Sequence, residues 1–188
     1  MEDYLREIEL VLKCRMEEIP GIIELCEGHI KKESAECSIE AVLLTKIKWV
    51  ISEMLTNAVK HSGVDMCLLK IILTKKQLVI EKQDSGPPLI LNNFDTGNKI
   101  IWPLQHQLEN LNFQIYHNGM DSLRVRTDES DEATFFIDEL LDVEMPALLT
   151  DISEHFGLLI ITKASDKLTY QYDREKHMNR FRSHFNLI

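Results

Sequence analysis

The stretch that decides the fold is Ile47-Lys48-Trp49-Val50-Ile51-Ser52-Glu53-Met54-Leu55-Thr56-Asn57-Ala58-Val59-Lys60-His61, followed by Ser62 and Gly63. Glu53, Asn57 and His61 recur at every fourth residue, so on a helix of about 3.6 residues per turn they lie on one polar face. The opposite side is apolar and can pack on a core; it carries Ile47, Val50, Ile51, Met54, Ala58 and Val59. The stretch therefore predicts an amphipathic helix, and Gly63 is a typical C-terminal stop.

The polar face of this helix carries side chains that suit a binding site. Asn57 has a carbonyl oxygen that can ligate a hard cation, and the Glu53 carboxylate can orient a water or a hydroxyl group. The same spacing also fits an ordinary helix with a solvated polar stripe, which is a common arrangement. The spacing alone leaves both interpretations open.

Patterns along most of the remaining chain predict one strand, two helices and two pairs of antiparallel strands. Alternation of apolar and polar residues predicts a strand, and helical spacing predicts two helices; apolar runs around short polar turns predict two hairpins. The ranges are a strand over 7–14, helices over 19–32 and 39–61, and strand pairs over 66–73 with 78–82 and over 167–172 with 179–185. Segregated elements of this kind are typical of two-layer α+β domains.

The segment 89–153 is too long for a structureless loop, so we expect an insertion with its own elements. Pro103 suits the first turn of a helix that we expect from Trp102 to Leu111. Asn118-Gly119 is a strong signal for a type I′ hairpin; the flanking strands would span 113–117 and 122–127, and a further strand or helix would span 133–140. The insertion is expected to dock a partner or to extend the core sheet.

Composition favours one cytoplasmic domain. A chain of 188 residues is long enough for a sizeable core, and its net charge of −10 argues against nucleic-acid binding. No apolar run reaches membrane-spanning length, and the acidic start Met1-Glu2-Asp3 is unlike a signal peptide. The cysteines show no C-x-x-C spacing, so we expect reduced thiols rather than a zinc site or a disulfide framework; they are Cys14, Cys26, Cys37 and Cys67.

Three motifs in this order resemble those of the Bergerat-fold (GHKL) ATPases, the superfamily of gyrase, heat-shock chaperone and histidine-kinase ATPases. Glu53-x-x-x-Asn57-Ala58-x-Lys60-His61 is similar to the N-box, and Asp84-Ser85-Gly86-Pro87-Pro88 resembles the first glycine box as it occurs in bacterial anti-sigma factor serine kinases. Phe156–Ile161, with Asp166 downstream, resembles the second glycine box and the helix after it. The resemblance implies a two-layer α/β sandwich over residues 1–188, with helices on one face of a mixed, mostly antiparallel sheet and an insertion at 89–153.

The resemblance assigns the base-binding half of a nucleotide site. Asp84 would accept a hydrogen bond from the exocyclic amine of adenine, and Gly86 would allow the backbone to approach the ring because it has no Cβ. Without the other motifs, Asp84-Ser85-Gly86 would be an ordinary turn.

The resemblance also assigns the phosphate half of the site, with ATP and Mg²⁺ as cofactors. Asn57 would hold Mg²⁺, and Glu53 would act as the catalytic base or orient the attacking group. Lys60 and His61 would face the phosphates, although Lys60 also fits a surface lysine and His61 a favourable cation at the helix C-terminus. Gly157 would present backbone N–H groups to the phosphates at the start of a helix.

The chain departs from the family pattern in several places. His155 stands where the family has the first glycine of a Gly-x-Gly, and the Gly-Thr that many members carry before the last strand is missing. The interval between the glycine boxes is longer than in compact anti-sigma kinases. Asn179 resembles an asparagine that some of these relatives carry in the last strand.

Three functions fit these observations. The first is an anti-sigma-type serine/threonine kinase that transfers the γ-phosphate of ATP to a serine of an antagonist protein. Its partners would be a sigma factor and that antagonist; relatives of this type often form homodimers, but the sequence leaves the oligomeric state open. The second is a detached histidine-kinase catalytic module, for which the N-terminal segment offers no phospho-accepting histidine with the usual flanking pattern. The third is a catalytically inactive module that uses the fold to bind a partner.

Overall fold

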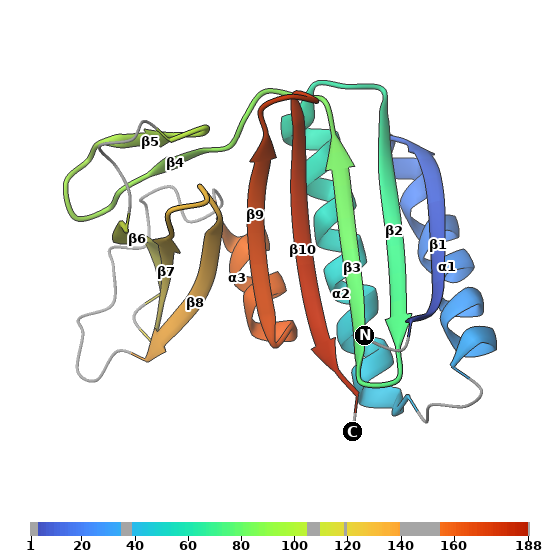
Figure 1. Ribbon diagram of the computed structural model, residues 1–188. Coiled ribbons are helices and arrows are strands. Elements are labelled where there is room, and N and C mark those ends of the chain that lie inside the picture. Colours follow the sequence, from blue (N-terminus) through green and yellow to red (C-terminus); the bar gives the residue numbers. More distant parts are fainter. Residues whose placement is uncertain (1–3, 35–38, 105–109, 119, 140–154, 188) are drawn as a thin grey trace.

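The computed structural model describes residues 4–34, 39–104, 110–118, 120–139 and 155–187. An eight-stranded sheet dominates it, with the strand order β1-β2-β3-β10-β9-β8-β7-β6. Each neighbouring pair of strands in this sheet is antiparallel. We expected a mixed, mostly antiparallel sheet, but the described strands contain no parallel pair. Figure 1 shows the three helices on one face of the sheet. The chain is therefore an α+β protein built on a large antiparallel sheet.

The described strands include the predicted N-terminal strand and both predicted hairpins, and further strands lie between them in the chain. They are β1 (Tyr4–Lys13), β2 (Met66–Thr74), β3 (Gln77–Asp84), β4 (Ile90–Asn92), β5 (Lys99–Ile101), β6 (Asn112–His117), β7 (Asp121–Thr127), β8 (Ala133–Glu139), β9 (Lys167–Asp173) and β10 (Met178–Asn186). The strand predicted over 7–14 is β1, and the two predicted hairpins are β2–β3 and β9–β10. These predictions are confirmed: burial alternates along β2, whereas β3 is buried on both faces over five consecutive residues and therefore reads as an apolar run.

The helices also agree with the sequence patterns. They are α1 (Ile19–Glu33), α2 (Ala41–Asn57) and α3 (Phe156–Ala164); a 3₁₀ turn, η1 (Met16–Glu18), precedes α1, and a π-helical turn, η2 (Ala58–Ser62), continues α2. Pro20 lies in the first turn of α1, where its missing N–H removes no helical hydrogen bond. Gly63 ends η2 in the left-handed conformation, with φ of 62°, as expected for a C-terminal stop.

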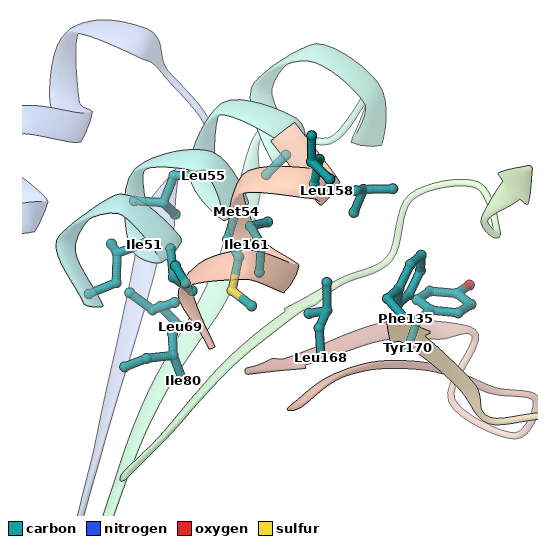
Figure 2. Close-up of a cluster of buried hydrophobic side chains, with 14 of the residues drawn as sticks. Ile51, Met54, Leu55, Leu69, Ile80, Phe135, Leu158, Ile161, Leu168 and Tyr170 are labelled. Carbon is teal, nitrogen blue, oxygen red and sulfur yellow. The ribbon is translucent and has the colours of Figure 1, made fainter. Parts of the chain in front are cut away.

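The hydrophobic core lies between the three helices and the sheet. The buried residues of α2 are Ile47, Val50, Ile51, Met54 and Leu55, which reproduces the apolar stripe read from the sequence. Figure 2 shows Ile51, Met54 and Leu55 of α2 beside Leu158 and Ile161 of α3, with Leu69, Ile80 and Leu168 of the strands beneath. Packing on both the sheet and α3 fixes the rotation of α2, so its polar stripe faces away from the core.

The segment after residue 88 extends the main sheet. Strands β6, β7 and β8 continue it beyond β9, and β4 pairs with β5 in a separate two-stranded sheet. The hairpin predicted around Asn118 is β6–β7, but His117 pairs with Ser122, so the loop is longer than the two-residue type I′ turn. Gly119 and residues 140–153 lie outside the described residues.

The helix predicted from Trp102 to Leu111 is wrong in its described part. Trp102 follows β5 in non-helical backbone and is 1 % exposed. Its backbone N–H donates to Leu89 O at 3.0 Å, and its indole Nε1 donates to Asp131 O at 3.0 Å. These long-range hydrogen bonds and the burial of a large ring outweigh the local helical spacing. Residues 105–109 lie outside the described part.

No helix in the described ranges combines the length and the apolar character needed to cross a membrane.

Candidate functional site

A cavity of about 900 Å³ lies where the end of α2, the end of β3, the segment after it and the start of α3 meet. The predicted site residues Glu53, Asn57, Lys60, His61, Asp84 and Gly157 all line it. Gly86 is buried close by, although it is not among the lining residues. The fold therefore gathers around one cavity three motifs that are up to about a hundred residues apart in the chain.

The π-helical turn at the end of α2 shapes one wall of this cavity. Glu53 and Asn57 lie on the regular helix, whereas Lys60 and His61 follow in η2, where the helix widens. Lys60 and His61 are exposed at the cavity, and Glu53 and Asn57 are half-buried. Local π-helical turns are frequent at functional sites, because they redirect side chains that a regular helix would align.

Gly157 brings the start of α3 against the polar face of α2. A Cβ added at this position would lie 2.7 Å from Glu53 Oε2 and 3.3 Å from Asn57 Oδ1. Only a residue without a side chain lets the α3 backbone come so close to both groups. Backbone N–H groups in the first turn of a helix have no intrahelical acceptor and favour anions. The carboxylate, the amide and this helix N-terminus therefore lie within one small region.

Gly86 allows a second close approach, between the β3–β4 segment and the end of η2. A Cβ at Gly86 would lie 2.3 Å from the carbonyl oxygen of Ser62. Ser62 is itself fixed, since its hydroxyl donates to Ala58 O at 2.6 Å. The two motifs are thus joined through their backbones, which sets the position of Asp84 relative to the helix.

Asp84 lies at the floor of the cavity and is 3 % exposed. Its Oδ1 accepts hydrogen bonds from the backbone N–H of Gly86 and from Asn179 Nδ2, both at 2.9 Å. Its Oδ2 pairs with the ammonium group of Lys82. The carboxylate is therefore held in one orientation by three donors.

The pKa of Asp84 reflects two opposing effects. Burial raises the pKa, because it disfavours the charged form. The charge of Lys82 and the hydrogen bonds from Lys82, Asn179 and the Gly86 N–H lower it, and together they outweigh burial. The net pKa lies below the ordinary value, so Asp84 is a carboxylate at neutral pH.

A hydrogen-bond network connects Asp84 to the next two strands of the sheet, β10 and β9. Asn179 Nδ2 also donates to the carbonyl oxygens of Gly86 and Pro87, at 3.0 and 3.1 Å. The Tyr170 hydroxyl donates to Asn179 Oδ1 at 2.7 Å and accepts the N–H of Leu89 at 3.0 Å. Asn179 and Tyr170 thus fasten the segment after Asp84 to β9 and β10.

Lys82 is the functional candidate that the sequence interpretation missed. It lines the cavity with a side chain only 5 % exposed, and its Nζ lies 5.0 Å from the centre of the Phe181 ring. The spacing of Lys82 and Asp84 indicates that both side chains lie on one face of β3, because side chains two residues apart on a strand share a face, but it does not show that Lys82 is buried. Phe181 on the neighbouring strand β10 completes this part of the floor.

The donor set at Glu53 and Asn57 suits Mg²⁺ better than a transition metal. Carboxylate and amide oxygens are hard ligands, and Mg²⁺ usually keeps several waters and takes few protein ligands beside substrate phosphates. In the ranges that the structure covers, no three His, Cys, Asp or Glu side chains are placed to hold a metal ion.

Comparison with models of known protein families and with curated protein sequences gave no match.

Proposed function

We propose that this chain is an ATP-binding regulatory protein with a Bergerat-type two-layer sandwich, acting in the cytoplasm as an anti-sigma-type serine/threonine kinase. One observation carries the proposal: the three resemblance motifs, distant in sequence, converge on one cavity of about 900 Å³. A cavity of this size suits a cofactor-sized ligand. Gly86 and Gly157 support the proposal, because a Cβ at Gly86 would collide with the end of the Glu53–His61 helix and a Cβ at Gly157 would collide with the Glu53 side chain.

The residues that line the cavity fall into two groups, one that would bind the base of the nucleotide and one that would bind its phosphates. Asp84 and its neighbours would hold the base, and the apolar segment Pro87–Leu91 would cover it. Asn57 would ligate Mg²⁺, which neutralises phosphate charge when bound. Lys60, His61 and the first turn of α3 would bind the phosphates, and Glu53 would take the proton of an attacking hydroxyl or water.

Calorimetric titration of Mg-ATP into the purified protein tests this proposal. We expect binding that Asn57→Ala weakens at least roughly tenfold, because the variant removes a metal ligand. Asn98→Ala, on an exposed residue between β4 and β5, is the matched control and should bind like the parent. Nucleotide binding by the parent that Asn57→Ala leaves unchanged would refute this placement of the metal.

Glu53→Gln separates binding from catalysis. If Glu53 is the base, the variant should still bind Mg-ATP but lose hydrolysis of ATP and transfer to a serine of the antagonist protein. A parent protein that binds Mg-ATP without turning it over would remove the kinase assignment and leave nucleotide binding.

A catalytically inactive, partner-binding module is the second candidate function. His155 favours it, since it lines the cavity at the position where the family has a glycine. A side chain there narrows the space in which a phosphate loop would close. In that case nucleotide would be structural or would not bind, and the insertion would serve the partner.

A further inference from the structure

The floor of the cavity holds a charged donor that the proposed function leaves without a role. The ammonium group of Lys82 has three N–H donors. Within the described residues its partners are Asp84 Oδ2 and the face of the Phe181 ring. Lys82 lines the cavity although its side chain is only 5 % exposed. A molecule that fills the cavity therefore meets a buried ammonium group with N–H donors to share, and such a group strongly favours an acceptor.

Asp84, beside Lys82, can accept one further hydrogen bond. Each carboxylate oxygen offers about two acceptor positions. Oδ1 already accepts from Gly86 and Asn179, and Oδ2 accepts from Lys82. The position that remains is on Oδ2, next to the ammonium group. The floor therefore presents one cationic donor and one anionic acceptor side by side.

The edge of adenine that carries the 6-amino group complements this pair. The amino group is a donor, and the ring nitrogen N1 beside it is an acceptor. When the amino group donates to Asp84 Oδ2, N1 can accept from Lys82, and hydrogen bonds to charged groups are stronger than those between neutral groups. Guanine also carries an acceptor, O6, next to a donor, N1–H. The pair thus selects an edge with an adjacent donor and acceptor, and does not by itself exclude guanine.

The depth of the floor indicates which edge of adenine reaches it. A second acceptor, N7, also lies next to the amino group, but it belongs to the ring that carries the ribose at N9. N1 lies on the side of the base farthest from the sugar. Lys82 and Asp84 are buried at the floor, whereas Lys60 and His61, which would bind the phosphates, are exposed. A nucleotide that reaches both places therefore puts N1, and not N7, on the floor.

We propose that Lys82 is a base-binding residue of this cavity, whose ammonium group donates to N1 of adenine while Asp84 Oδ2 accepts the 6-amino group. This role rests on the nucleotide site proposed above and adds to it a contact from outside the three motifs. Phe181, with Leu89 and Leu91, supplies apolar surface for the faces of the ring. Lys82 is then a residue that determines which bases fit.

Calorimetric titration of the full chain with the magnesium complexes of ATP, 1-deaza-ATP and 7-deaza-ATP tests this contact. 1-Deaza-ATP has a C–H group in place of N1 and keeps the amino group. It should bind at least roughly tenfold more weakly than ATP, the scale of one hydrogen bond to a charged group. 7-Deaza-ATP has a C–H group in place of N7 and is the matched control, which should bind like ATP. This comparison needs no variant of the protein.

Lys82→Met assigns the contact to the lysine. The variant keeps a long, unbranched side chain that cannot donate, so ATP and 1-deaza-ATP should bind with nearly equal affinity. Lys176→Met, the same change on an exposed turn between β9 and β10, should keep the parent's preference for ATP. Circular dichroism and thermal unfolding check that both variants fold.

The possible failures are distinguishable. 1-Deaza-ATP that binds as tightly as ATP in the parent would overturn the contact with N1 and leave the nucleotide site intact. Weaker binding of 7-deaza-ATP alone would place N7 on the floor and would also overturn it. A preference for ATP over 1-deaza-ATP that survives in folded Lys82→Met would overturn the role of Lys82. No binding of any of the three nucleotides would refute the proposed function and this role together.

Discussion

Asn179 Nδ2 lies 2.9 Å from Asp84 Oδ1 and donates a hydrogen bond to it across 95 residues of sequence. Both side chains are buried, at 4 % and 3 % exposed, and they face each other from neighbouring strands β10 and β3. The same amide reaches the carbonyl oxygens of Gly86 and Pro87. One asparagine therefore fixes both the carboxylate at the cavity floor and the turn that follows it.

Replacing this asparagine should loosen the whole floor. In Asn179→Ala, Asp84 loses one hydrogen bond, the two carbonyls lose their side-chain donor and the Tyr170 hydroxyl loses its acceptor. Leaving buried polar groups unsatisfied costs about 1–3 kcal/mol, so urea denaturation should show a loss of that size. Asn186→Ala, at the exposed end of the same strand, should change stability by less than about 0.5 kcal/mol.

A double-mutant cycle with Tyr170→Phe tests the network itself. Because Tyr170 donates directly to Asn179, the two substitutions should show a coupling of roughly 0.5–3 kcal/mol. Additive effects of the two substitutions would mean that the network contributes nothing beyond its separate hydrogen bonds.

Asp84→Asn should destabilise the protein in a pH-dependent manner. The variant leaves the Lys82 ammonium buried without its carboxylate, which costs about 3–5 kcal/mol at neutral pH. The pKa of Asp84 is lower in the folded protein than in the unfolded chain, so its carboxylate stabilises the fold above the unfolded pKa. That contribution is lost as the pH falls through the folded pKa.

The difference in the free energy of unfolding between the parent and Asp84→Asn should therefore shrink on acidification below about pH 4. Urea denaturation at pH 7, 5 and 3 measures it. Asp65→Asn, on an exposed residue before β2, should show little difference from the parent at any of these pH values. If the difference in unfolding free energy between the parent and Asp84→Asn stayed constant from pH 7 to pH 3, it would contradict an ionised Lys82–Asp84 pair.

The local parts of this fold and site could be predicted from the sequence. Periodicity placed the apolar face of α2 in the core because burial on one side imposes a period of about 3.6 residues. The spacing of Glu53 and Asn57 predicted a shared polar face, and the short turns predicted both hairpins. Each of these features depends on residues close together in the chain.

Long-range features could not be predicted in the same way. Nothing near Trp102 in the sequence shows that its indole N–H reaches Asp131, so the helical spacing there was misleading. Lys82 lies in the polar run Glu81-Lys82-Gln83, which is typical of a solvated strand end. Its burial results from Phe181 and Asp84, and only the register of β3 against β10 brings Phe181 next to it.

Gly86→Ala should be strongly destabilising, because the new Cβ would lie 2.3 Å from the carbonyl oxygen of Ser62. That contact is with backbone, which cannot move away without shifting the end of η2. Overpacking of this kind costs about 1–3 kcal/mol or more, measurable by thermal unfolding. Gly28→Ala is the matched control: it lies in α1 with nothing within 4 Å of the added Cβ, so helix propensity should raise stability by up to about 1 kcal/mol.

Gly157→Ala should affect binding more than stability. The added Cβ would lie 2.7 Å from Glu53 Oε2, the far end of a flexible side chain that can turn aside. The gain in helix propensity, up to about 1 kcal/mol, offsets part of the strain, so the unfolding temperature should change little. The added Cβ would also lie 3.3 Å from Asn57 Oδ1, so the proposed Mg²⁺ ligand beside the start of α3 would have to shift. Titration with magnesium nucleotide should then show affinity reduced by roughly tenfold or more in a fully folded variant. Parent-like affinity together with a parent-like unfolding temperature would show that nothing in the cavity depends on this close approach.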